Sequence, residues 1–273
     1  MKALDILKLN KAIKSAYSYE IGEIASLEHD TLNAIYNSLV QIDDTHFMLA
    51  YAGSGDGGFI KIFSIDGSYN ITEIKSLKHD TSYGRFNSLV KIDDTHFMLA
   101  YTGDGGYIKI FSIDGSYNIT EIKSLKHDTS YGRYNSLVKI DDTHFMLAYA
   151  GGGDGGFIKI FSIDGDYKIT QIDSLKHDAS YGTHNSLVKI DDTHFMLAYT
   201  ESDNYGYIKT FSIDGSYNIT QIDSLRHDTS YGRFNSLVKI DDTHFMLAYT
   251  GDGGYIKIFS IDGSYNITEI KSL

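Results

Sequence analysis

Hydrophobic residues recur along the chain in short runs of strand length, and the runs repeat in groups of four. In one unit they are NSLVKI at 87–92, HFMLAY at 96–101, YIKIFSI at 107–113 and YNITEIKSL at 117–125. Asp or Gly turns bound each run, as expected of β-strands. IDGSYN places Asp-Gly between two apolar runs, and the two aspartates of IDDTH suit another tight turn. The pattern therefore predicts units of four antiparallel strands.

Two of these four strands are apolar on both of their alternating faces. FMLAY is apolar throughout and YIKIFSI nearly so, which means that both faces of the sheet need a cover. Blades stacked around an axis provide one, because each sheet then packs between two others. NSLVKI would line the central channel and YNITEIKSL would form the outer rim. We therefore predict a β-propeller.

The unit occurs five times. DDTHFMLAY starts at residues 43, 93, 141, 191 and 241. His-Asp pairs precede the units at intervals of 50, 48, 50 and 50 residues, and the short interval reflects a loop that is AGSGDGG in the first unit but TGDGG in the second. Loops commonly absorb such differences. The predicted fold is all-β, a five-bladed propeller of four-stranded antiparallel blades over residues 19–273.

The two ends of the chain complicate this arrangement. SYEIGEIASLEHD at 18–30 is a diverged copy of the outer strand, and the chain also ends in SYNITEIKSL at 264–273. Six outer strands for five blades leave two alternatives, in which one copy closes the ring beside the last blade or a partial sixth blade is present. Residues 1–18 are predicted to be an N-terminal extension, either a short helix, from apolar residues at helical spacing, or a strand through LDILKL.

Charge and composition narrow the possible partners. The net charge is −12, with 36 acidic against 24 basic side chains, which opposes binding to nucleic acid or to anionic membranes. The chain has no cysteine, which fits the cytosol without requiring it. Asp5 interrupts the first apolar run, and no run approaches the roughly 20 apolar residues of a membrane span. We expect a soluble protein without a signal peptide, without membrane insertion and of open oligomeric state.

The unit length, the four strands and the ring-compatible pattern resemble β-propeller repeats over about residues 19–273. Five near-identical blades resemble, in architecture, the five-bladed lectin propellers of the tachylectin type. That resemblance implies similar pockets that recur around the ring and bind sugars.

One face of this propeller collects the residues best suited to a ligand. The connectors between blades and the GDGG loops should emerge together, opposite the IDDTH and IDGSYN turns. They bring an aromatic ring, a planar cation and carboxylates, which bind sugar hydroxyls or a polar peptide. The predicted ligand-binding residues are His79, Asp80, Tyr83, Arg85, Asp104, Tyr131, Arg133, Asp154, Tyr231, Arg233 and Asp252.

The His-Asp pairs leave two interpretations open. They can contact a ligand, or they can tie each connector to its neighbour by hydrogen bonds. The first unit keeps His29 and Asp30 although it lacks the tyrosine and arginine of the other units, which suits the structural role.

Catalytic and metal sites find less support in the sequence. Enzymes usually need one asymmetric set of groups, whereas these units are nearly identical. The DDTHF histidines suit solvated turns, and one aspartate in GDGG supplies too few ligands for calcium. No metal and no cofactor are therefore predicted. Only the fourth unit offers an asymmetric candidate, formed by His184, Glu201, Asp203 and Tyr205.

These observations predict a non-enzymatic, multivalent binding propeller with a glycan as its ligand. Repeated weak sites on one rigid ring raise avidity, which suits duplicated blades. A protein-interaction scaffold on the same face is the alternative. A hydrolase with its site at the channel mouth is the third hypothesis.

Overall fold

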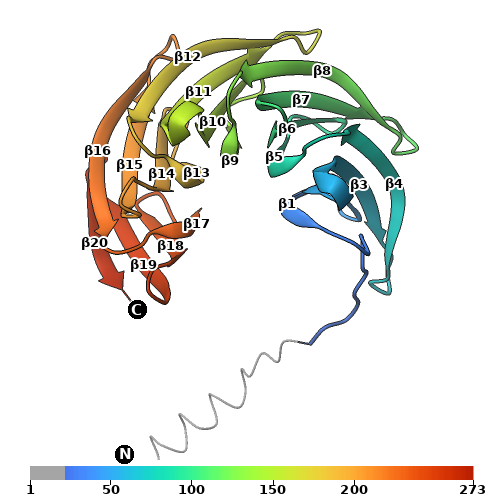
Figure 1. The fold of residues 1–273 in the computed structure, drawn as a ribbon, viewed down its shortest axis with the longest axis horizontal. Helices are drawn as coiled ribbons and strands as arrows, with labels where there is room; N and C mark the ends of the chain where they lie inside the picture. The colour runs from blue at the N-terminus through green and yellow to red at the C-terminus, as the bar shows by residue number, and fades with distance from the viewer. Residues whose placement is uncertain (1–21, 273) are drawn as a thin grey trace, which may run out of the picture.

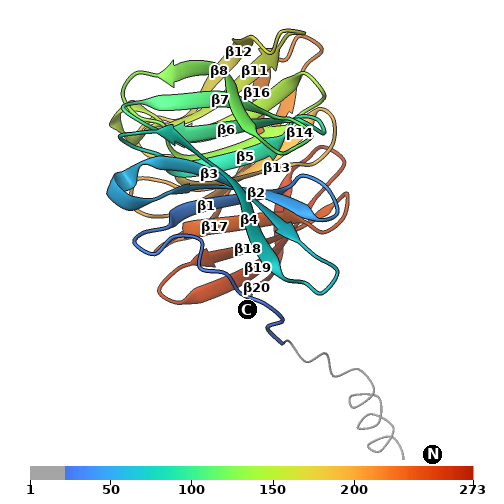
Figure 2. The ribbon, with the colours of Figure 1, turned by 90° about the vertical axis from the view of Figure 1, so that its right-hand side faces the viewer.

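The protein forms five four-stranded antiparallel sheets, which confirms the predicted all-β, five-bladed propeller (Figures 1 and 2). The computed structural model describes residues 22–272. Blade 1 comprises β1 (Ile35–Gln41), β2 (His46–Ala52), β3 (Gly58–Ile65) and β4 (Ile71–Asp80), and blade 2 comprises β5 (Arg85–Lys91), β6 (His96–Thr102), β7 (Gly106–Ile113) and β8 (Ile119–Asp128). Blade 3 comprises β9 (Arg133–Lys139), β10 (His144–Ala150), β11 (Gly156–Ile163) and β12 (Ile169–Asp178). Blade 4 comprises β13 (Thr183–Lys189), β14 (His194–Thr200), β15 (Gly206–Ile213) and β16 (Ile219–Asp228), and blade 5 comprises β17 (Arg233–Lys239), β18 (His244–Thr250), β19 (Gly254–Ile261) and β20 (Ile267–Ser272).

Strand order in each blade follows chain order, so each blade is a meander of hairpins. The strands match the predicted runs closely, and the first strand of each blade lies innermost. The outer strands differ most from prediction, because β8 continues to Asp128 and so includes the His-Asp pair. The two loops of the AGSGDGG type form short 3-10 helices, η1 (Ser54–Asp56) and η2 (Gly152–Asp154).

The hydrophobic core lies between blades. Each second strand turns alternate residues to its two sides, so that Leu99 of blade 2 packs toward blade 1 whereas Met98 packs toward blade 3. We call the side of a blade that carries Leu99 or its equivalents the leading face, and the side that carries Met98 or its equivalents the trailing face. Both residues are fully buried in blade 2. This packing explains why FMLAY is apolar at every position.

The blades follow one another along an arc, with blades 1 and 5 at its two ends (Figure 1). Among residues 22–272, blade 5 does not pack against blade 1 as the other neighbours pack. β20 fills the outer position of blade 5, whereas residues 22–30 form no strand. The described part of the extra outer-strand copy therefore neither closes the ring nor starts a sixth blade. The helix or strand predicted within residues 1–18 lies outside the described residues.

No helix among residues 22–272 has the length and apolar character that a membrane span requires.

Candidate functional site

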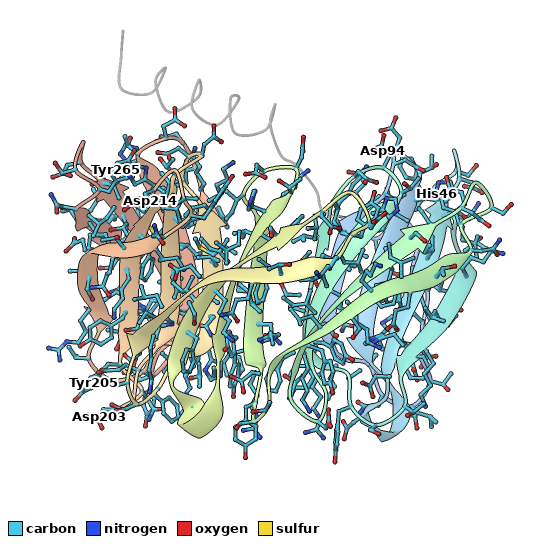
Figure 3. The ribbon with its side chains drawn as sticks, turned by 90° about the horizontal axis from the view of Figure 1, so that it is seen from above. His46, Asp94, Asp203, Tyr205, Asp214 and Tyr265 are labelled. Carbon is cyan, nitrogen blue, oxygen red and sulfur yellow. The ribbon has the colours of Figure 1, made fainter. Side chains whose placement is uncertain are left out.

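The loops and turns of the blades gather on two opposite faces of the arc. Figure 3 places Asp203 and Tyr205, from the loop between β14 and β15, at one edge, and Asp94, Asp214 and Tyr265, from hairpin turns, at the other. We call these the connector face and the turn face. The segregation agrees with the sequence-based expectation that connectors and GDGG loops emerge together.

The turn face carries the same polar cluster at every contact between blades. Asp93 accepts hydrogen bonds from the backbone amides of Thr95 and His96 and, at 3.0 Å, from the hydroxyl of Tyr167 in blade 3. The ring of Tyr167 stacks on His96 with 4.0 Å between centroids. Burial alone would raise the pKa of Asp93, but these hydrogen bonds outweigh it and lower the pKa to about 2. The cluster therefore joins neighbouring blades.

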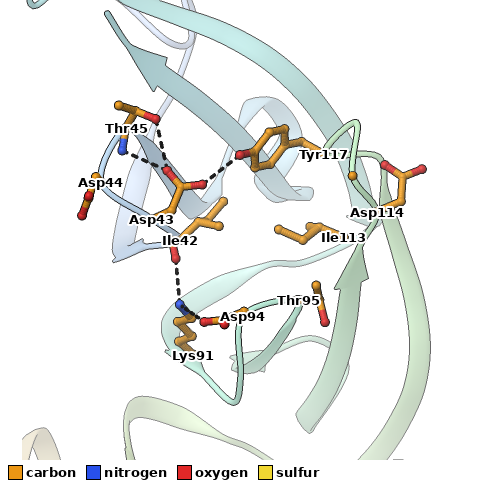
Figure 4. Close-up of a pocket in the computed structure, with 11 residues that line it drawn as sticks. Ile42, Asp43, Asp44, Thr45, Lys91, Asp94, Thr95, Ile113, Asp114 and Tyr117 are labelled. Carbon is orange, nitrogen blue, oxygen red and sulfur yellow. Dashed lines mark hydrogen bonds and ion pairs between the residues drawn. The ribbon is translucent and has the colours of Figure 1, made fainter. Parts of the chain in front are cut away.

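The depressions on the turn face lie directly beside these clusters. The one between blades 1 and 2 has a volume of about 720 Å³ and is drawn in Figure 4. Lys91 there donates to the carbonyl of Ile42 at 2.7 Å and lies 2.9 Å from Asp94, while Tyr117 donates to Asp43 at 2.8 Å. Because these groups already satisfy one another, the depression suits the joining of blades better than the binding of a ligand.

The His-Asp pairs lie inside the propeller wall. His79 is only 7% exposed and contacts Tyr101 of blade 2 edge-on, with 4.8 Å between ring centroids. A Cβ added to Gly58 would lie 2.4 Å from the His79 ring, so glycine is required there. Burial lowers the pKa of His79 to about 3 and keeps the ring neutral. Asp80 accepts hydrogen bonds from the Tyr101 hydroxyl and the Ser82 amide, both at 2.9 Å. This geometry supports the structural interpretation of the pairs.

The arginines of the connectors lie over the neighbouring tyrosines. The guanidinium of Arg133 is 4.3 Å from the centre of the Tyr131 ring, and the corresponding distance from Arg85 to Tyr83 is 5.5 Å. Each arginine also contacts a loop, but the partner differs between blades. Arg85 pairs with Asp56 of blade 1, Arg133 lies 3.9 Å from Asp154 of its own blade, and Arg233 donates to Asn204 of blade 4 at 2.6 Å.

Five of the eleven predicted ligand-binding residues meet in one cleft. A cavity of about 520 Å³ between blades 2 and 3 is lined by Tyr83, Arg85, Asp104, Tyr131 and Arg133. The remaining members of the predicted set lie elsewhere. Tyr231 and Arg233 lie beside the blade 4 loop, and Asp252 accepts a hydrogen bond from Tyr255 in blade 5. His79 is buried, and Asp80 next to it is half-buried.

A row of aromatic rings lies next to this cleft, at the mouth of the channel. It consists of the residue before the asparagine of each first strand. Neighbouring ring centroids lie 4.2, 4.5, 4.4 and 4.6 Å apart. We call this set the aromatic row, and its members are Tyr36, Phe86, Tyr134, His184 and Phe234.

The backbone is strained at every position of the aromatic row. All five residues have φ between 51° and 57°, which is unusual for non-glycine side chains. Each lies in a register shift of the first strand, such as that between Thr183 and Ser186, and such bulges redirect side chains. The next asparagine holds the turn, since Asn87 donates to the carbonyls of Gly84 at 2.7 Å and Tyr36 at 3.1 Å. The tyrosines of the turn face also have positive φ, between 58° and 63°, so this backbone conformation belongs to the repeat and does not by itself mark a functional site.

His184 distinguishes the fourth position of the row. Its ring lies between those of Tyr134 and Phe234 and borders a cavity of about 380 Å³. Burial, and then the charge of Arg233, lowers the pKa of His184 to about 4, so the imidazole is neutral at pH 7. Its Nδ1 lies 3.1 Å from Oγ1 of Thr183. A proton on Nδ1 donated to that oxygen leaves the Nε2 lone pair free.

Glu201, Asp203 and Tyr205, the other three candidates of the fourth blade, do not line the cavity that His184 borders. Burial raises the pKa of Glu201, and the neighbouring Asp178 and Asp203 add to that effect. Tyr205 lies under the guanidinium of Arg226, 5.2 Å from its carbon. The predicted asymmetric site is thus reduced to His184. The aromatic row itself was not predicted, although an aromatic residue directly before Asn in every unit is a visible signal.

Within residues 22–272, no three His, Cys, Asp or Glu side chains converge in a way that could hold a metal ion.

No family model matches this sequence, and no curated protein is similar to it in sequence. Solved structures share its fold. A protein from Lactobacillus plantarum is 14% identical with a TM-score of 0.67, covering 92% of this chain and 73% of its own. A proposed 6-phosphogluconolactonase from Bacteroides fragilis is 14% identical with a TM-score of 0.69, covering 86% of this chain and 70% of its own. The periplasmic gluconolactonase PpgL of Pseudomonas aeruginosa is 13% identical with a TM-score of 0.51, covering 87% of this chain and 85% of its own.

These comparisons correct two predictions. The sequence led us to expect a non-enzymatic, carbohydrate-binding propeller, whereas the similar structures named by activity here are lactonases. The lectin-like interpretation relied on the repetition of the blades, which is a property of the fold and does not identify a ligand. The resemblance to tachylectin-type propellers therefore extends only to the β-propeller architecture.

Proposed function

We propose that this protein is a lactonase, a hydrolase that opens lactones, and that it acts at the channel mouth on the connector face. Names of similar folds contribute only an analogy at this level of identity. The proposal rests on His184, which places a neutral imidazole in the aromatic row, whereas the other four positions hold tyrosine or phenylalanine.

The proposed chemistry is hydrolysis of a cyclic ester. Nε2 of His184 accepts a proton from water while the water oxygen attacks the lactone carbonyl carbon. The ring C–O bond then breaks, and the protonated imidazole returns the proton to the departing ring oxygen. The product is the open hydroxy acid, and the imidazole regains its neutral form. General base catalysis of this kind typically contributes a factor of about 10² to 10⁴.

The surroundings of His184 suit a sugar lactone. Tyr36, Phe86 and Tyr134 border both the mouth cavity and the cleft between blades 2 and 3, so the two spaces adjoin. Aromatic faces offer apolar cover for a sugar ring, and polar groups at the rim can fix its orientation. Arg85 and Arg133 line the adjoining cleft, and although each lies beside a loop aspartate, the remaining N–H groups of the two guanidinium groups can bind an anionic substituent such as a phosphate.

The test is to compare two single variants in the hydrolysis of gluconolactone and 6-phosphogluconolactone. His184→Phe reproduces the phenylalanine found at the same position in blades 2 and 5, so the stack and the fold should be retained. We expect it to lower kcat/KM by about 10² to 10⁴. Tyr134→Phe is the matched control, since it changes the neighbouring ring without removing an imidazole, and it should stay within a few-fold of the wild type.

Two results would overturn the proposal. One is a wild-type protein that opens both lactones no faster than buffer. The other is a His184→Phe variant as active as Tyr134→Phe, with thermal unfolding confirming that both variants are folded.

A further inference from the structure

The four contacts between successive blades share one set of interactions. At each, a leucine amide donates to a serine hydroxyl of the preceding blade at 2.9 Å. The asparagine after the aromatic row donates to the carbonyl of the row residue in the preceding blade, and a lysine donates to an isoleucine carbonyl there. Between these bonds, the leading face of one blade packs on the trailing face of the blade before it. We call this set the blade contact.

Blade 1 offers the leading half of a blade contact, and no described residue completes it. Leu39 is 63% exposed, whereas the equivalent Leu89 of blade 2 is 6% exposed. Tyr69 is 62% exposed, whereas the equivalent Tyr117 donates to Asp43 of the preceding blade. In the described chain, the leading face of blade 1 therefore has no blade in front of it.

Blade 5 offers the trailing half. Met246 is 37% exposed, whereas Met196 of blade 4 is fully buried. Val238 on the same face is also exposed. The His244 side chain is 42% exposed against 20% for His194, because no tyrosine among residues 22–272 stacks on it.

The chain just ahead of blade 1 shows where a preceding blade would lie. His29 contacts Tyr51 of blade 1 edge-on, with 4.8 Å between ring centroids, as His79 contacts Tyr101 of blade 2. In both pairs, a lysine of the third strand donates to the histidine carbonyl. His29 thus occupies the place where the outer strand of a preceding blade ends. Residues 22–28 lead to that place, but they form no strand and are mostly exposed, because no described third strand lies beside them.

We propose that the opening of the arc is the binding surface for two further blades of this same repeat. One would cover the trailing face of blade 5 and the other the leading face of blade 1, with residues 22–28 as its outer strand. The five blades already take up more than half of the ring, so the opening is too small for a whole second copy (Figures 1 and 2).

The chemistry of the two faces favours blades of this repeat. The faces are the two halves of a contact that the chain forms four times from nearly the same residues, so a blade of this repeat carries the complement of each. Gln41 stands where the other blades have the lysine of the blade contact, and its amide can still donate to a carbonyl.

The number of blades follows from the sizes of similar structures. The aligned part of this chain covers 73% of the Lactobacillus plantarum protein and 70% of the Bacteroides fragilis protein. Five blades account for that share, so the rest of each chain is enough for about two more blades of this size.

The test extends the full chain by a copy of residues 78–163 placed behind residue 273. The extension continues the repeat in register and adds one complete blade and three inner strands of another, so residues 22–28 must supply the last outer strand. The amide of Leu39 should exchange its hydrogen at least about tenfold more slowly than in the original chain, because it gains a serine acceptor and a cover. In the same way, a slowly exchanging amide in the added copy of Leu89 reports the contact with blade 5.

Two substitutions test the contact with blade 1 independently. Leu39→Lys should lower the midpoint of thermal unfolding of the extended chain but leave that of the original chain unchanged, where Leu39 is exposed. Ile172→Lys is the matched control and should lower neither midpoint, because Ile172 is 39% exposed on the outer strand β12, away from both end faces.

Three results would overturn the proposal. In the first, the copy of Leu89 is protected from exchange but Leu39 is not, so the added blades leave the ring open. In the second, the extension stays unfolded beside the two free faces, which should order it. In the third, Leu39→Lys affects the extended chain no more than Ile172→Lys does.

Discussion

The turn face and the connector face are built from the same repeat, yet they have diverged to different degrees. On the turn face, a tyrosine from the last hairpin turn of each of blades 2 to 5 donates a hydrogen bond to an aspartate of the preceding blade. The four distances from hydroxyl to carboxylate are 2.8, 3.0, 2.7 and 2.6 Å. We call this residue the junction tyrosine. On the connector face, Arg85 contacts an aspartate of the preceding blade, Arg133 an aspartate of its own blade and Arg233 an asparagine, and blade 4 has Thr183 in place of the arginine. The uniform face holds the blades together, and the varied face carries the asymmetry on which the proposed catalytic site depends.

The largest effect on stability should come from the uniform face. In Asp141→Ala the amides of Thr143 and His144 and the hydroxyl of Tyr217 all lose their acceptor. We expect a loss of about 1–3 kcal/mol in the free energy of unfolding, with unchanged kcat/KM for lactones. Denaturant titration and a hydrolysis assay measure the two quantities.

Tyr131→Ala provides the matched change on the connector face. Tyr131 is exposed, so its removal should alter the free energy of unfolding by about 0.5 kcal/mol or less. If it destabilised the protein as much as Asp141→Ala does, the division between a structural and a functional face would be refuted.

A smaller difference in the free energy of unfolding measures what the junction tyrosine alone contributes. Asp241 accepts the same amide bonds as Asp141, from Thr243 and His244, but no tyrosine of the described chain reaches it. In dilute solution, Asp241→Ala should therefore cost less than Asp141→Ala by about 0.5–1.5 kcal/mol, the usual contribution of one hydrogen bond. Equal losses in parallel denaturant titrations would show that the tyrosine contributes nothing to the stability of the contact between blades.

Much of the architecture could be predicted because it depends on local patterns. Strands alternating with Asp-Gly turns predicted the hairpins, and runs that are apolar on both faces predicted stacked blades. The open arc was not predictable in this way, because the angle between blades depends on how whole faces pack. The strand pattern of the sequence does not encode that angle.

The site was harder to predict than the fold. Tyr83, Arg85, Tyr131 and Arg133 were correctly expected to share a face, since chain order fixes the side on which a connector emerges. Their loop partners come from different blades, which no single unit reveals. His184 was noticed as a departure from the repeat, but its position between two rings depends on a strained bulge and on residues about 50 positions away.

The pH dependence of kcat/KM for gluconolactone, corrected for the buffer reaction, tests the role of His184 most directly. The general base must be unprotonated, and burial lowers the pKa of His184 to about 4. The account predicts a constant kcat/KM from neutral pH down to about 5, followed by a loss through pH 4 that is absent from the residual activity of His184→Phe. A loss centred near 6.5, the ordinary value for an imidazole, or the same acid limb in His184→Phe, would contradict it.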